Sequence, residues 1–304
     1  MEAAEFVPAE RFAHLMLRPR ELSALCLLFG ATAWGLAWYP YRVLETRGIG
    51  GIEALLWTYL AAIAVTTALL PRAWAELRDR PGWGLAIAAA AGFTNIAYVL
   101  AVLRGDVLRV LLMFYLAPLW TVPLARLILR ERLDRSAAAA IACALAGAAA
   151  TLWRPDSGYP LPDSAPDWLA LSAGFAFALT NVTTRAAAAL GDGAKVLAPS
   201  LGVVLLALPW LAFHRSPELA DGRSGGTLAI IVATGVLLAA IAAAVQYGVT
   251  HMRANRAIVV MLFEIVVGAA SSTLIAGERV TGSEVAGGLL IAGASLFAVR
   301  ERRG

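Results

Sequence analysis

One carboxylate, Glu264, lies deep within an apolar run of the sequence. It follows Arg256 by eight residues, and none of the other 20 acidic residues lies so far from the ends of such a run. On a helix this spacing is ~12 Å, close to the midplane of a bilayer. An ionised carboxylate is costly there, so it should face a wet cavity, contact a basic or polar partner, or be protonated. Two interpretations stay open. In the first, Glu264 exchanges protons or contacts an amine group of a solute. In the second, a neutral Glu264 forms a hydrogen bond between helices.

The run that holds Glu264 repeats an earlier one. Residues 109–133 and 256–280 align at a shift of 147 residues, and both begin with Arg and end with Glu, Arg and an apolar residue. About 20 mostly apolar residues lie between these ends, which is the length that a helix needs to cross a bilayer. Both copies are therefore predicted to span a membrane, and the duplication predicts a protein built from two repeats.

The repeat alignment also predicts a cavity wall. Glu264 aligns with Ala117, and a 3.6-residue helix places Met113 and Trp120 on the same face as Ala117. Rings and amides near mid-depth in other runs could bind a small amphipathic solute. These further candidates are Trp34, Asn95, Tyr98, Asn181 and Gln246. For each of them, packing or a hydrogen bond between helices remains the alternative.

Three prolines are candidate hinges. Pro118 and Pro123 lie in the run 109–133, and Pro40 lies in the first apolar run. Each removes a backbone N–H from a helix and so predicts a kink, which serves either as a hinge or as a static bend. The run around Glu264 has no proline, so we expect it to bend less than its counterpart.

Composition excludes water as the main solvent of this chain. Of its 304 residues 60% are apolar and 15% charged, whereas soluble domains hold about 45–50% and about 25%. Binding to nucleic acid is not expected, because the basic residues lie between apolar runs and not on an aromatic-rich stripe. The three His and two Cys show no metal-ligand spacing, so we expect no metal and no cofactor.

Ten apolar runs predict ten transmembrane helices. Their ranges are 22–44, 52–70, 84–103, 108–129, 136–153, 168–190, 194–213, 227–250, 257–276 and 283–299. With both termini in the cytoplasm, 16 basic residues lie on the cytoplasmic side and eight on the other side, as the positive-inside rule favours. Five helices per repeat, an odd number, then require the second repeat to be inverted relative to the first.

The predicted fold class is therefore all-α integral membrane, with ten helices in two inverted five-helix repeats. Residues 154–167 hold four of the 14 prolines and are predicted to link the repeats. The predicted parts are an N-terminal cytoplasmic segment 1–21, a first repeat 22–153, the linker 154–167, a second repeat 168–299 and a cytoplasmic tail 300–304.

The chain resembles the EamA family of the drug/metabolite transporter superfamily over residues 22–299. The resemblance rests on Trp34-Gly35, Leu116-Ala117-Pro118, Phe263-Glu264 and the acids that follow the two copies, Glu131 and Glu278. It departs from the family pattern at Ile265, where a proline commonly follows the glutamate. It implies an alternating-access carrier whose central cavity is shared by the first, third, fourth, sixth, eighth and ninth helices.

The predicted function is secondary transport of a small organic solute, such as an amino acid or an amphipathic aromatic compound. Protons are a candidate coupling ion. The heavy use of Arg over Lys is typical of a GC-rich bacterial genome, and the resemblance to the family implies a location in the inner membrane. A membrane-embedded enzyme is one alternative, but no nucleophile with a base and no cofactor loop occurs at one depth. A scaffold is the other, and it would not explain two repeats that meet at a carboxylate.

Overall fold

The computed structural model describes residues 19–130, 135–152, 162–213, 225–251, 260–261 and 263–300, and within them all regular structure is helical. The helices are α2 (Pro19–Leu36), α3 (Trp38–Thr46), α4 (Gly51–Leu69), α5 (Ala73–Asp79), α6 (Pro81–Arg104), α7 (Val107–Phe114), α8 (Ala117–Ile128), α9 (Arg135–Leu152), α10 (Ala165–Ala186), α11 (Asp192–Phe213), α12 (Gly225–His251), α14 (Phe263–Leu274) and α15 (Gly282–Arg300). The all-α class is thus confirmed. Glu131, residues 1–18, residues 301–304 and most of the predicted linker lie outside the described residues.

Six helical stretches of the described chain are long and apolar enough to cross a membrane. They are Glu21–Thr46, Gly51–Leu69, Pro81–Arg104, Val107–Ile128, Asp192–Trp210 and Gly225–His251. The helices α9, α10, α14 and α15 lie in the other ranges for which spans are predicted, and α14 is apolar but has only 12 residues. The chain is therefore arranged as a multi-pass membrane protein. α10 begins at Ala165, inside the predicted linker, and α5 is a short helix that the apolar runs do not predict.

The first predicted span is interrupted at Ala37, which separates α2 from α3. Pro40 has no N–H to donate to the carbonyl of Leu36, four positions before the proline and one before the break. The chain tightens there, and the N–H of Ala37 donates to the carbonyl of Trp34 at 3.0 Å. The candidate hinge Pro40 thus lies beside a real interruption of the helix.

The fourth predicted span is also interrupted, between α7 and α8. Pro118 lies in the first turn of α8 and cannot donate to the carbonyl of Phe114. Pro123 lies within α8 without interrupting it, as Pro199 and Pro209 lie within α11. The described part of the ninth span, α14, is continuous from Phe263 to Leu274.

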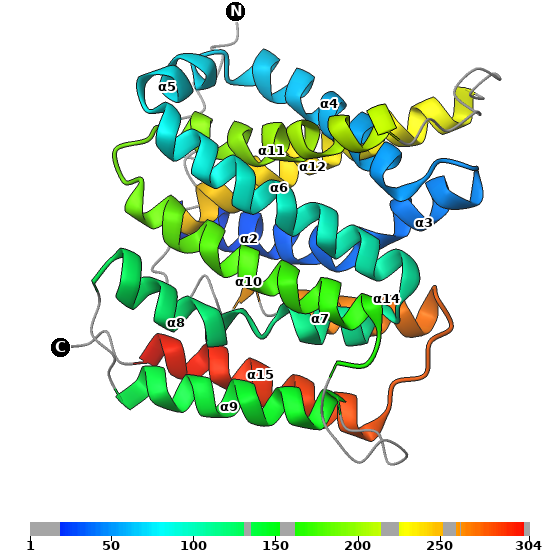
Figure 1. Cartoon of the computed structure of the whole chain (residues 1–304), viewed down its shortest axis with the longest axis vertical. Coiled ribbons are helices and arrows are strands. Elements are labelled where there is room, and N and C mark those ends of the chain that lie inside the picture. The colour runs from blue at the N-terminus through cyan, green and yellow to red at the C-terminus, as the bar shows by residue number, and fades with distance from the viewer. Residues whose placement is uncertain are drawn as a thin grey trace, which may run out of the picture.

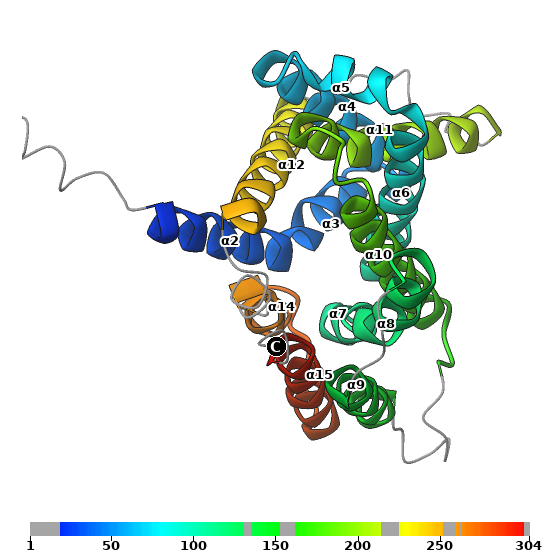
Figure 2. The same cartoon turned by 90° about the vertical axis from the view of Figure 1, so that its left-hand side faces the viewer.

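The helices form a bundle whose members run across the view of Figure 1. α9 pairs with α15, α6 packs against α10 and α11, and α12 packs against α2 and α4, as Figures 1 and 2 show. α2 also contacts α14, and α10 contacts α7 and α8. In Figure 1, α2 begins and α15 ends at the left, whereas α3 and residues 275–281, which join α14 to α15, lie at the right. We call the right-hand end the Glu278 end.

Glycines allow the backbones of neighbouring helices to approach closely. A Cβ at Gly202 of α11 would overlap the carbonyl group of Ala88 on α6, and a Cβ at Gly92 would overlap Gly202. In lipid, such small residues are the main means of bringing helices into close contact. The contact between α6 and α11 therefore depends on Gly202.

A larger residue at position 202 should lower the stability of the bundle. In Gly202→Leu the side chain would force α11 away from α6, and overpacking of this kind costs ~1–3 kcal/mol or more. The melting temperature of the detergent-purified variant should fall clearly below that of the wild type. Gly225→Leu is the control, because no atom lies within 4 Å of a Cβ at that position. Equal melting temperatures for the two variants would contradict this account of the packing.

Candidate functional site

Glu264 lies at the start of α14, where it is 6% exposed. The Tyr115 hydroxyl donates a hydrogen bond of 2.5 Å to Oε2 of Glu264. Tyr115 lies between α7 and α8, at the interruption of the fourth span. Within the described residues the carboxylate has this hydroxyl as its hydrogen-bond partner and forms no ion pair. Contact with a polar partner, one of the three environments expected for this carboxylate, is therefore the one that the structure contains.

The first span reaches Glu264 through its backbone. A Cβ built on Gly35 of α2 would lie 3.0 Å from the carbonyl O of Glu264 and 2.8 Å from Cβ of Val267. Only a residue without a side chain allows this approach without a shift of one helix. Trp34, next to Gly35, is partly buried against the main hydrophobic core. Two interrupted helices therefore meet α14 at Glu264, and interrupted helices form the binding sites of many secondary transporters.

Aromatic rings surround the Tyr115 side of the site. The Phe114 ring lies 5.7 Å from the Tyr115 ring, 5.3 Å from that of Tyr98 and 4.9 Å from that of Phe177, measured between centroids. The Tyr98 hydroxyl is buried and has no hydrogen-bond partner among the described residues. It lies close enough to interact electrostatically with Glu264. Rings and a hydroxyl beside a carboxylate suit a solute that has an apolar body and a polar or positive group.

The remaining candidates on the fourth span lie near its interruption, two of them buried and Trp120 partly buried. Met113 is fully buried and Ala117 is 7% exposed. The Trp120 indole N–H is buried without a hydrogen-bond partner in the described part of the chain, and its ring meets that of Phe175 edge-on at 5.6 Å. These three residues lie on both sides of the break, so they do not share the continuous helical face that the sequence predicts.

Two predicted candidates make hydrogen bonds elsewhere, and a third is exposed. Asn95 accepts a hydrogen bond of 2.7 Å from the Tyr59 hydroxyl and so links α6 to α4. Gln246 donates to Oδ1 of Asp192 at 2.9 Å, which links α12 to the start of α11. Asn181 is exposed on α10. For Asn95 and Gln246, the alternative of a hydrogen bond between helices therefore describes the observed contacts.

A buried ion pair that the sequence does not predict joins α7 to the start of α10. Arg109 donates from Nε to Oδ1 of Asp167 at 2.8 Å and from Nη2 to Oδ2 at 2.9 Å. Asp167 is 1% exposed and lies just before the predicted span 168–190. Burial raises the pKa of Asp167, but the hydrogen bonds and charge of Arg109 outweigh this and hold the pKa below its ordinary value of 3.8. The pair therefore helps to fix α10 against α7.

A model of the EamA-like transporter family matches residues 22–153 and residues 165–300 of the chain. An uncharacterized transporter of Pseudomonas aeruginosa is 30% identical over 211 residues, which cover 66% of this chain and 65% of the relative, slightly less than two thirds of its length. An uncharacterized transporter of Bacillus subtilis is 27% identical over 215 residues, 68% of this chain and 69% of the relative.

The fold is also found among solved structures. A protein of known crystal structure aligns with a TM-score of 0.61 and 19% identity over 94% of this chain and all of that protein, which shows a shared fold. The family model covers both halves of the chain, and the named relatives are transporters. The chain therefore belongs to the EamA-like transporter family.

Proposed function

We propose that this transporter is a secondary carrier that moves a small organic solute across the bacterial inner membrane by alternating access. The observation that carries the proposal is the hydrogen bond between Glu264 and Tyr115, where two interrupted helices meet α14. A buried carboxylate is retained in a membrane helix at a substantial free-energy cost, and such groups are typical of solute and proton pathways. Glu264 then serves as the group that exchanges a proton or contacts a positive group of the solute.

Two inverted repeats would place this site between the halves of the protein. The family model matches each half of the chain separately. The helix contacts also come in equivalent pairs: α2 of the first half packs against α12 and α14, and α10 of the second half packs against α6 and against α7 with α8. Under the predicted repeats, both sets join helix one of a repeat to helices three and four of the other repeat. This pattern supports a pseudo-two-fold relation between the repeats, and the predicted odd number of helices per repeat would place the axis in the plane of the membrane.

The solute we propose is small and amphipathic, such as an amine, an amino acid or an aromatic metabolite. The carboxylate of Glu264 would attract a positive group, and the rings of Tyr98, Phe114 and Phe177 would contact an apolar body. Under the charge bias of the loops, both termini face the cytoplasm and the Glu278 end faces the opposite side. The site would then open alternately to the two sides.

A metabolite panel tests the proposed function. Purified protein is first screened by thermal shift against amines, amino acids and aromatic metabolites, because a ligand that binds only the folded state raises the melting temperature. Each solute that does so is then offered to proteoliposomes, with protein-free liposomes as the control. We expect uptake of at least one solute by the proteoliposomes alone. Folded protein that neither binds nor moves any solute of these classes would contradict the proposal.

A further inference from the structure

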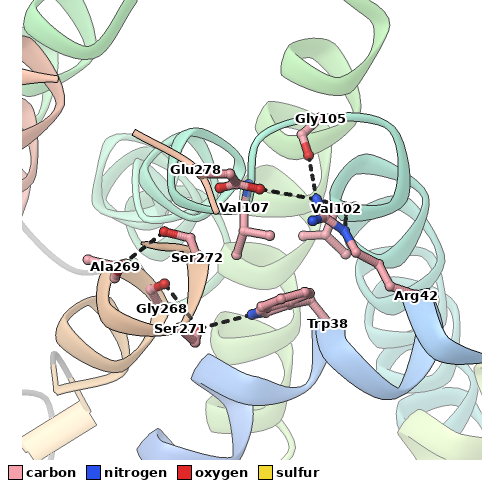
Figure 3. Close-up of polar contacts among 10 residues, drawn as sticks. All are labelled: Trp38, Arg42, Val102, Gly105, Val107, Gly268, Ala269, Ser271, Ser272 and Glu278. Carbon is pink, nitrogen blue, oxygen red and sulfur yellow. Dashed lines mark hydrogen bonds and ion pairs between the residues drawn. The ribbon is translucent and has the colours of Figure 1, made fainter. Parts of the chain in front are cut away.

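We infer that Arg42 and Glu278 form a gate that closes the Glu278 end of the transport pathway in the described state. This inference rests on the proposed function, because a gate presupposes a pathway. Figure 3 shows the two side chains facing each other between α3 and the segment that follows α14. Arg42 Nη2 lies 3.2 Å from Glu278 Oε1.

The contact joins both halves of the chain. Arg42 donates to the carbonyl of Val102 from Nε at 3.2 Å and from Nη2 at 3.0 Å, and from Nη2 to that of Gly105 at 3.0 Å. Glu278 accepts a hydrogen bond of 2.9 Å from the backbone N–H of Val107 through its other oxygen. The guanidinium thus holds the end of α6 while the carboxylate holds the start of α7. Separation of Glu278 from the first half must break its contact with Arg42 and its hydrogen bond with Val107.

A line of contacts connects the gate to Glu264. Trp38 Nε1 donates to Ser271 Oγ at 3.1 Å, and Ser271 Oγ donates to the carbonyl of Gly35 at 3.1 Å. The Arg42 guanidinium carbon lies 4.9 Å from the centroid of the Trp38 ring. Glu264 and Ser271 are seven residues apart on α14, about two helical turns, and so lie on one face. The first span therefore contacts α14 at Gly35, beside Glu264, and at Trp38, beside Arg42, and Figure 3 shows the contact of Trp38 with Ser271.

The gate differs from the buried pair of Arg109 and Asp167 in its access to water. The side chains of Arg42 and Glu278 are 29% and 15% exposed, against 9% and 2% for Arg109 and Asp167. A cavity of about 80 Å³ also lies beside Glu278 and is lined mainly by polar residues. Partly exposed charges can separate and become hydrated at a small cost, whereas a buried pair cannot. The first pair suits a contact that opens and closes, and the second suits a permanent one.

Thiol labelling tests the gate without any solute. The reporter is Ser272→Cys, a fully buried residue that lines the cavity, in a background in which Cys26 and Cys143 are replaced by Ala. A membrane-impermeant thiol reagent is added to vesicles from the side on which an Arg47→Cys variant reacts, since Arg47 is exposed at the Glu278 end.

Removal of either charge should open the gate more often. Arg42→Gln and Glu278→Gln should each raise the labelling rate about tenfold, as expected for loss of a partly exposed charged contact with its hydrogen bonds. The double variant should gain little beyond the larger single effect, because both changes break one contact. Trp38→Phe keeps the ring but loses the hydrogen bond to Ser271, so it should give a smaller increase.

Two controls make the result decisive. Arg47→Gln removes a charge from the same end and should leave the labelling rate unchanged. Melting temperatures show whether a variant is folded, and Glu278→Gln keeps an oxygen that can accept from Val107, so it tests the gate even if Arg42→Gln does not fold. Unchanged labelling in folded Glu278→Gln, or an equal increase in Arg47→Gln, would overturn the gate. Transport of a solute by the wild type would still support the proposed function in that case.

Discussion

Replacement of Glu264 by Gln should abolish the pH dependence of transport while the protein stays folded. Gln keeps the size of the side chain and an oxygen that can accept from Tyr115, but it cannot bind or release a proton at this position. Uptake of a panel solute into proteoliposomes, measured from about pH 5.5 to 8.5, should therefore become independent of pH. For a solute with a positive group the rate should also fall strongly, since a partly buried charge contact is lost.

A second buried acid provides the control for this prediction. Glu53 of α4 is 5% exposed and lies near Trp57, whose Nε1 donates to Oε1 at 3.3 Å. Glu53→Gln removes a buried carboxylate outside the candidate site, so its pH profile should match that of the wild type. If Glu264→Gln transports with an unchanged rate and pH profile, Glu264 is a structural hydrogen-bonding residue and the proposed coupling is wrong.

Asp167→Asn should cause a large loss of stability. It removes the negative charge that makes both short contacts with the buried Arg109 guanidinium and leaves the more exposed Asp163, 3.9 Å away. Breaking a buried pair of this kind costs about 3–5 kcal/mol. The melting temperature in detergent should fall accordingly. Asp192→Asn is the matched control, because the Asp192 side chain is 60% exposed and 3.9 Å from Lys195. A surface pair contributes ~0–1 kcal/mol, so this variant should melt close to the wild type.

The stabilising effect of Asp167 should also depend on pH in one direction. The pKa of the folded state lies below the ordinary value of 3.8. The stabilisation is therefore fully present above that value and is lost as the pH falls through the folded pKa. The difference in melting temperature between the wild type and Asp167→Asn should be constant near neutral pH and should shrink in acid. A difference that grows as the pH falls would contradict the ion pair as its cause.

The sequence predicts the positions of the helices well, because an apolar run of about 20 residues is typical of a helix that crosses a membrane. It also places Pro40 and Pro118 beside the two interruptions, since a missing N–H acts locally along the chain. The sequence does not predict Tyr115 as a partner of Glu264. In a continuous helix whose Met113 and Trp120 face Glu264, residue 115 would point away from it. The interruption before Ala117 changes that rotation. A break one turn before Pro118 is the signal from which Tyr115 could have been predicted.

Contacts between distant segments were beyond the reach of local patterns. Arg42 and Glu278 are 236 residues apart, and Arg109 and Asp167 are 58 apart. In the sequence, each of these four residues resembles an ordinary charged residue of a loop. Only the packing of the helices brings the members of each pair together. Gln246 shows the same limit, because an amide in an apolar run suggests either a cavity or a hydrogen bond between helices, and only the packing of α12 brings it to Asp192.

Access to the candidate site from both sides of the membrane tests the account most directly. A single cysteine is introduced as Ala117→Cys, in the background without Cys26 and Cys143, and is probed with an impermeant thiol reagent in right-side-out and inside-out vesicles. Arg47→Cys and Arg72→Cys mark the two sides and should each react from one side only. Both residues are exposed; Arg47 directly follows α3 and Arg72 directly precedes α5, and Figure 1 shows these helices at opposite ends of the bundle. Alternating access predicts that the cysteine at position 117 reacts from both sides. Reaction from neither side, or from one side alone, would contradict it.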